Sequence, residues 1–159
     1  MTELPARWPT GLSSDVWVDT RLQAHHAVQL LASFAGEYLE PRDDDGHRSL
    51  CWVDHESRLA TGSAERGDAP LTVTFDPETF VLGVVAPTGE ASLALAGRTL
   101  NDARAWLIDE LAGRTAEPPT LAAPEYSMPE HPVTRGAALI PDLSAAADLA
   151  RWFSAAAWA

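Results

Sequence analysis

The sequence contains no lysine. All 11 of its basic residues are arginines, they stand against 23 acidic residues, and the formal net charge is −12. The absence of lysine excludes a lysine Schiff base and the lysine of a P-loop. The excess of negative charge disfavours nucleic acids and anionic membrane surfaces, because the field of the protein repels polyanions. We therefore expect a partner that is neither a nucleic acid nor a membrane.

Cysteine and long apolar runs are also scarce. Cys51 is the single cysteine, so the chain cannot form an internal disulfide. Residues 1–8 hold no apolar run that resembles a signal peptide. No stretch of the sequence approaches the roughly 18 apolar residues that a membrane-spanning helix needs. These absences predict a cytoplasmic protein.

The motifs of common catalytic and metal sites are missing as well. The chain has no G-x-S-x-G elbow, no glycine-rich phosphate loop and no dinucleotide fingerprint. Residues 54–57 include the residue types of a catalytic triad, but consecutive residues in a strand or turn point in different directions. Metal-ligand spacings are absent from the candidate histidines, which are His25, His47, His55 and His131. We therefore predict no metal site and no cofactor.

What the sequence does contain is the composition of a globular protein. Hydrophobic residues make up 46% of its 159 residues and charged residues 21%, which argues against disorder. A chain of this length favours one domain. We expect a single domain that spans residues 1–159.

The clearest helical pattern lies near the N-terminus. Thr20 and Gln23 fit a capping box, so the helix is expected to begin between Asp15 and Thr20. Pro41 then stops it. The apolar residues that recur at helical spacing are Ala24, Val28, Leu31, Ala35 and Tyr38.

Between residues 50 and 95 the apolar pattern changes to a period of two, which is typical of strands. Short turns separate the successive runs and indicate an antiparallel meander. Within it, Cys51 is expected to be a small buried side chain and Trp52 a core residue. The predicted strands cover residues 50–53, 58–63, 71–75, 80–86 and 91–95.

Two further helices are predicted after the strands. Thr99 and Asp102 resemble a helix cap, and Gly113 stands where a helix-ending glycine belongs. Residues 117–141 are rich in proline and predict an extended segment along the surface. A final helix over residues 142–159 lacks a stop signal, so we expect the natural protein to extend past this helix.

The whole pattern predicts an α+β fold. It consists of a long N-terminal helix, an antiparallel meander of about five strands, and two further helices packed on the sheet.

Polar side chains interrupt the apolar pattern of the first helix. His25 and Gln29 are one turn apart and so share a face, whereas His26 points about 100° away and is expected to be exposed. Together with Trp17 and Trp52, they are predicted to line a pocket between this helix and the sheet. The alternative is that His25 is half-buried and bonded to a backbone carbonyl, as buried polar groups usually are.

Three functions remain open on these residues. The first is a small-molecule binding or accessory domain that uses the predicted pocket. The second is an enzyme with His25 as general base or metal ligand. The third is a protein-interaction module, in which the proline-rich segment and the final helix dock a partner, a missing C-terminal half or another copy of the chain. An exposed patch of Trp152, Phe153 and Trp158 would favour this third function.

Several short motifs follow one another along the chain, namely Trp8-Pro9, Trp17-x-Asp19-Thr20, His25-x-x-x-Gln29, residues 71–76, Gly89, residues 98–102, His131 and residues 151–153. Their order resembles an uncharacterised bacterial domain-of-unknown-function family, whose members share a "WP…W.DT…LH…Q" N-terminal pattern. The chain departs from that pattern after His47 and around Trp52. The family has no established activity, and its members are longer, so the resemblance implies a fold and a longer natural protein rather than a function.

Overall fold

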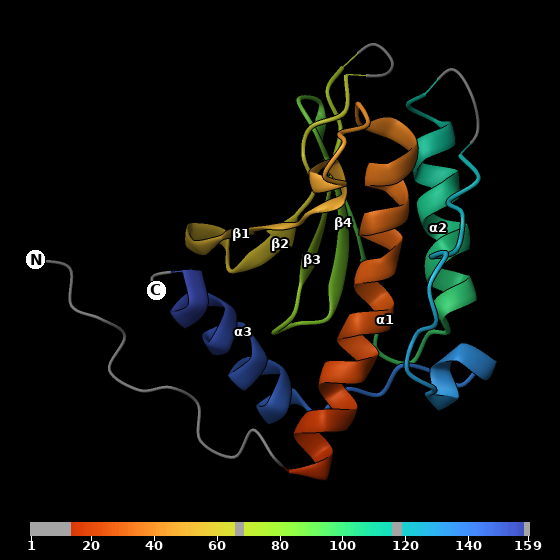
Figure 1. The fold of residues 1–159 in the computed structure, drawn as a ribbon. Helices are drawn as coiled ribbons and strands as arrows, with labels where there is room; N and C mark the ends of the chain where they lie inside the picture. The colour runs from red at the N-terminus through yellow and green to blue at the C-terminus, as the bar shows by residue number, and fades with distance from the viewer. Residues whose placement is uncertain (1–13, 66–68, 116–118, 158–159) are drawn as a thin grey trace, which may run out of the picture.

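The computed structural model describes residues 14–65, 69–115 and 119–157 (Figure 1). It confirms the α+β fold with its long N-terminal helix, antiparallel sheet and two later helices. The helices are α1 (Asp15–Tyr38), α2 (Leu100–Ala112) and α3 (Leu143–Ala157). The strands are β1 (Cys51–Val53), β2 (Arg58–Ala60), β3 (Thr72–Asp76), β4 (Val81–Ala86) and β5 (Gly89–Ala94). Short 3₁₀ helices are η1 (Gly46–Arg48), η2 (Asp54–Glu56) and η3 (Pro132–Arg135).

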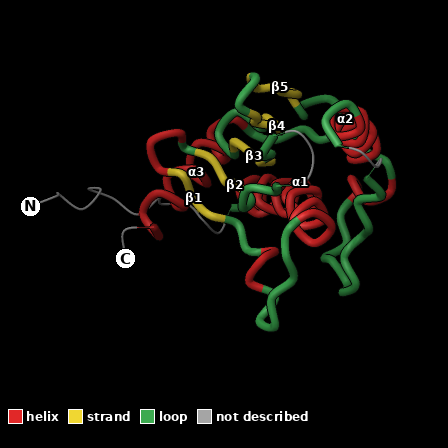
Figure 2. Tube along the Cα trace, turned by 90° about the horizontal axis from the view of Figure 1, so that it is seen from above, coloured by secondary structure: helices red, strands yellow, loops and turns green. Residues whose placement is uncertain are grey.

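The strands form one antiparallel sheet whose order, β1-β2-β3-β4-β5, follows the chain. Three of the four connections between successive strands are tight turns. The longer one, residues 61–71 between β2 and β3, contains an antiparallel bridge between Ala64 and Leu71. Helices α1 and α2 lie side by side, and α1 crosses the middle of the sheet over β3 (Figures 1 and 2). Helix α3 starts beside the N-terminal half of α1 and diverges from it toward β1 (Figure 1).

One row of side chains crosses the helix-facing side of the sheet. The strand register aligns its members in neighbouring pairs, and side chains that face each other across paired strands share a face of the sheet. Phe75 and Leu82, in the middle of the row, are fully buried. The row consists of Trp52, Leu59, Phe75, Leu82 and Leu93. It forms the floor on which α1, α2 and α3 pack.

Helix α1 begins at Asp15, which lies within the predicted range, but its cap is not the predicted box. Ser14 is the N-cap, and its side-chain oxygen accepts a hydrogen bond from the Trp17 amide at 3.2 Å. The predicted box at Thr20 and Gln23 is wrong, because both residues lie inside the helix and are buried. Their polar groups bind a distant part of the chain instead of the helix end, as described below.

The capping prediction for α2 is confirmed. The Thr99 hydroxyl accepts from the Asp102 amide at 3.1 Å, and the Asp102 carboxylate accepts from the Thr99 amide at 2.9 Å. Gly113 ends the helix in a right-handed conformation, with φ at −72°.

Cys51 is exposed, which corrects the expectation of a buried thiol. Side chains alternate between the two faces of a strand, and the neighbouring Trp52 faces the helices. Cys51 therefore points to the opposite face of β1, at the edge of the sheet.

The proline-rich stretch that follows α2 runs back along α1 and α2 before α3 begins (Figure 1). We call residues 119–141 the strap. Apart from η3, the strap has no regular secondary structure, which agrees with the predicted extended segment.

Candidate functional site

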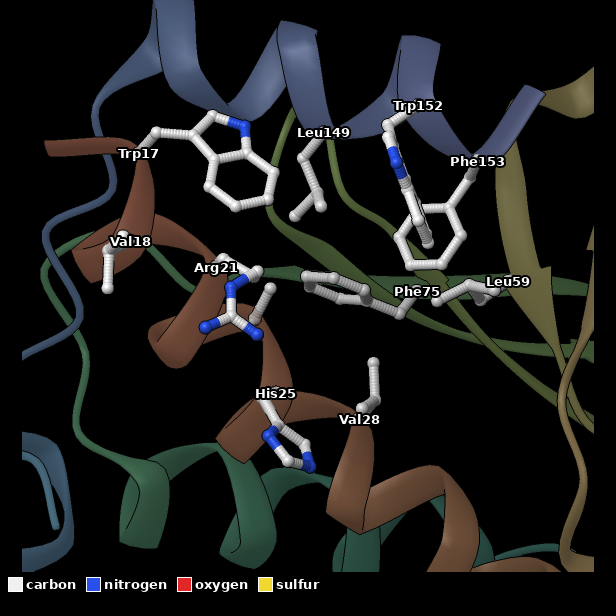
Figure 3. Close-up of a pocket in the computed structure, with 11 residues that line it drawn as sticks. Trp17, Val18, Arg21, His25, Val28, Leu59, Phe75, Leu149, Trp152 and Phe153 are labelled. Atoms are coloured by element: carbon white, nitrogen blue, oxygen red, sulfur yellow. The ribbon is translucent and has the colours of Figure 1, made fainter. Parts of the chain in front are cut away.

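An apolar groove of about 470 Å³ lies between α1, α3 and the helix-facing side of β2 and β3 (Figure 3). Its lining residues are those drawn as sticks in Figure 3. The groove lies where α3 diverges from α1, above the sheet residues Leu59 and Phe75.

Helix α1 forms one wall of the groove. Trp17, Arg21 and His25 follow one another at intervals of four residues and Val28 follows three residues later, so all four lie on one helix face. The Arg21 guanidinium carbon lies 5.6 Å from the centroid of the Trp17 ring, within the range of a cation–π contact. The indole Nε1 of Trp17 is buried without a hydrogen-bond partner among the described residues and points toward α3 (Figure 3). Trp17 therefore contributes ring surface to the groove.

Two members of the row of side chains on the sheet form the floor of the groove. Leu59 and Phe75 stand opposite each other on β2 and β3. Phe75 is fully buried, and its ring meets that of Phe80 edge to face with centroids 5.3 Å apart. The groove floor is thus part of the protein core rather than a loose surface.

Helix α3 forms the opposite wall through Leu149, Trp152 and Phe153. Trp152 and Phe153 meet edge to face with ring centroids 5.4 Å apart. Phe153 also stacks on Trp52 of β1, with centroids 5.4 Å apart and an interplanar angle of 18°. This stacking anchors the C-terminal half of α3 to the sheet edge and sets the width of the groove.

The four predicted pocket residues do not come together in one place. Trp17 and His25 line the groove. Trp52 stands behind its α3 wall, in contact with Phe153. Gln29 lies on a neighbouring face of α1, where its Oε1 accepts a hydrogen bond from the Tyr126 hydroxyl at 2.8 Å.

The two adjacent histidines occupy different environments, and that of His26 differs from the predicted one. His26 is buried rather than exposed, and its Nε2 donates to the Pro129 carbonyl at 3.0 Å. His26 faces away from the groove because it lies about 100° round the helix from His25. The strap covers that face of α1. His25 is half-buried, and its ring has no hydrogen-bond partner among the described residues. The backbone-carbonyl contact predicted as the alternative for His25 is thus made by His26.

Several other polar residues of α1 hold the strap and the start of α3 in place. Gln23 makes two hydrogen bonds with the backbone of Ile140, since its Nε2 donates to the carbonyl at 3.2 Å and its Oε1 accepts from the amide at 2.7 Å. The Thr20 hydroxyl accepts from the Asp142 amide at 3.1 Å. The Glu37 carboxylate accepts from the Leu121 amide at 2.8 Å. The polar stripe of the first helix is therefore explained by contacts within the fold.

His131 belongs to the same set of contacts. Its Nε2 donates to Asp19 Oδ1 at 2.9 Å, and its Nδ1 accepts from the Val133 amide at 3.3 Å. Both ring nitrogens are thus engaged. Among the described residues, no three histidine, cysteine, aspartate or glutamate side chains are placed to hold a metal ion.

Several groove residues escaped the sequence prediction. Arg21 could have been found from its four-residue spacing between Trp17 and His25. Leu149 and Phe153 could not, because their position opposite α1 depends on the path of the strap.

The burial of His26 predicts a loss of stability in mild acid. Burial lowers the pKa of its imidazole below the ordinary 6.5, the bond to Pro129 opposes this, and the nearby rings of His131 and His25 add to it. The unfolded chain therefore binds a proton more readily than the folded protein. Stability is full above about pH 6.5 and declines as the pH falls below that value, toward the folded-state pKa.

Urea unfolding midpoints measured between neutral pH and about pH 5 check this expectation. The variant His26→Gln should show a smaller fall in the midpoint than the natural protein. His55 offers a matched control, because its side chain is 80% exposed, and His55→Gln should keep the full fall. An undiminished fall in His26→Gln would assign the acid sensitivity to another group.

No protein-family model, curated protein or solved structure matches the chain. The family resemblance of the short motifs therefore stays a prediction. In the described ranges, no helix combines the length and the apolar character needed to cross a bilayer.

Proposed function

We propose that the protein binds a small, largely apolar organic molecule in the groove between α1, α3 and the sheet. The observation that carries this proposal is an apolar hollow whose floor is a fully buried part of the core. Its volume of about 470 Å³ falls within the range of roughly 300–1,000 Å³ that is typical of small-molecule sites. Such sites combine mostly aromatic and aliphatic walls with a few polar groups, as the groove does.

The other two functions have less support. In the described structure His25 makes no hydrogen bond to a carboxylate or to another acid–base group through its ring, so a general base would lack an orienting partner. Trp152 and Phe153 are half-buried in the groove wall rather than presented as a patch for a partner protein. Trp158, the third residue of the patch expected in an interaction module, lies outside the described residues.

Binding of the neutral dye Nile red tests the proposal. The dye is expected to gain fluorescence in the groove and to quench the tryptophans beside it. The variant Val28→Trp places an indole in the groove and should weaken dye binding about tenfold or more, which corresponds to about 1.4 kcal/mol. Fluorescence titration of the dye into each protein gives the dissociation constants.

Val16 provides the matched control on the same helix. Its side chain is 53% exposed and does not line the groove, so Val16→Trp should bind the dye as the natural protein does. Urea midpoints establish that both variants are folded. Equal dye affinity of Val28→Trp and Val16→Trp would place the dye elsewhere and refute the proposal.

A further inference from the structure

We infer that the ligand of the groove is an amphipathic monocarboxylic acid, whose carboxylate is bound by Arg21. This inference rests on the proposed function and adds the chemical class of the ligand. It starts from the charges of the groove. Among the described residues that line it, Arg21 is the one with a permanent charge, and none is acidic.

Arg21 has no anionic partner within the protein as described. No ion pair or side-chain hydrogen bond of the described residues includes it, whereas Arg58, for example, pairs with Glu90 at 2.7 Å. Carboxylates are abundant in a chain with a net charge of −12, yet none of those in the described residues pairs with this guanidinium. Arg21 therefore keeps its charge available on the groove side of α1.

The contact with Trp17 leaves the N–H donors at the edge of the Arg21 guanidinium free. The ring of Trp17 lies 5.6 Å from the guanidinium carbon, so the arginine is held through a cation–π contact that uses no N–H donor. The donors along the edge of the guanidinium can then bind a planar carboxylate through two parallel hydrogen bonds. Trp17 thus positions Arg21 for an anion.

His25 lies one helical turn from Arg21 on the same side of α1 (Figure 3). Its ring has no hydrogen-bond partner among the described residues, so an imidazole N–H is available to an oxygen of the same carboxylate. The apolar remainder of such a ligand would lie against Val28, Trp152 and Phe153, which are half-buried and line the groove. One cation in an apolar groove of an acidic protein matches a single negative charge better than a multiply charged anion.

Displacement of Nile red by three ligands whose chains each contain ten carbons tests the charge of the head group. These are decanoate, decanol and decyltrimethylammonium. Decanoate is expected to displace the dye at a concentration about tenfold lower than decanol, because hydrogen bonds to charged groups are the stronger ones. Decyltrimethylammonium should be the weakest of the three. In the variant Arg21→Gln the advantage of decanoate over decanol should disappear.

Arg151 supplies the control for a general effect of charge. It is exposed on α3 and pairs with Asp148 outside the groove, so Arg151→Gln should keep the preference for decanoate. Equal displacement by decanoate and decanol in the natural protein would refute the inference while leaving the proposed function intact. Retention of the preference in Arg21→Gln would also refute it. Failure of Nile red to bind at all would instead refute the proposed function.

Discussion

Replacement of Gln23 by alanine is expected to lower the free energy of unfolding by about 2–3 kcal/mol. The Gln23 side chain is 3% exposed and holds both backbone groups of Ile140, while its Nε2 also donates to Asp19 Oδ2 at 2.6 Å. Removal of the amide leaves the Ile140 N–H and C=O without these partners. Urea unfolding monitored by circular dichroism gives the change in free energy.

Gln29 is the matched control, because it is the same residue type on the same helix and also contacts the strap. Its Oε1 accepts a single bond, from Tyr126, whose side chain is exposed. Gln29→Ala should therefore cost less than about 1 kcal/mol. Hydrogen exchange at the strap should rise in Gln23→Ala and stay unchanged in Gln29→Ala. Losses of the same small size in both variants would show that Gln23 does not hold the strap.

Local periodicity was sufficient to predict the elements of the fold. The alternation of apolar residues indicates which side chains share a face of a strand, and short turns indicate that successive strands are antiparallel neighbours. The order of the sheet could therefore be predicted from the sequence. The cap of α2 was predictable for the same reason, since Thr99 and Asp102 satisfy each other within one turn.

The sequence predictions that failed concern residues whose hydrogen-bond partners are distant along the chain. Thr20 and Gln23 have the spacing of a capping box, but the same groups bind Asp142 and Ile140. Helix geometry places His25 and His26 on different faces of α1. It does not predict which of these faces the strap covers. Each of these residues has one local and one tertiary interpretation, and only the path of the strap decides between them.

The candidate site was predictable to the extent that it lies on α1. Trp17 and His25 are placed by the spacing of one helix, and the sheet floor follows from the strand pattern. The far wall is different, because Leu149 and Phe153 reach the groove only after the strap has returned the chain to α1. Gln29 follows His25 by four residues, and four steps of 100° place it about 40° further round the helix, where it meets Tyr126.

Replacement of Phe75 by alanine is expected to destabilise the protein by about 3–5 kcal/mol and to alter the groove. Phe75 is fully buried and lies in both the core and the groove floor. Truncation of its ring deepens the groove by a cavity, since surrounding side chains relax only in part. Urea unfolding measures the loss of stability, and the Nile red titration measures the change in the groove.

The variant Phe80→Ala separates the loss of stability in Phe75→Ala from the change in its groove. Phe80 is also fully buried and meets Phe75 edge to face, but it does not line the groove. The two variants should therefore lose similar free energy of unfolding, whereas Nile red affinity should change in Phe75→Ala alone. A parallel loss of affinity would mean that dye binding follows the stability of the whole fold. Unchanged affinity in both folded variants would mean that the dye does not contact the sheet floor, and the binding site would have to be sought outside the groove.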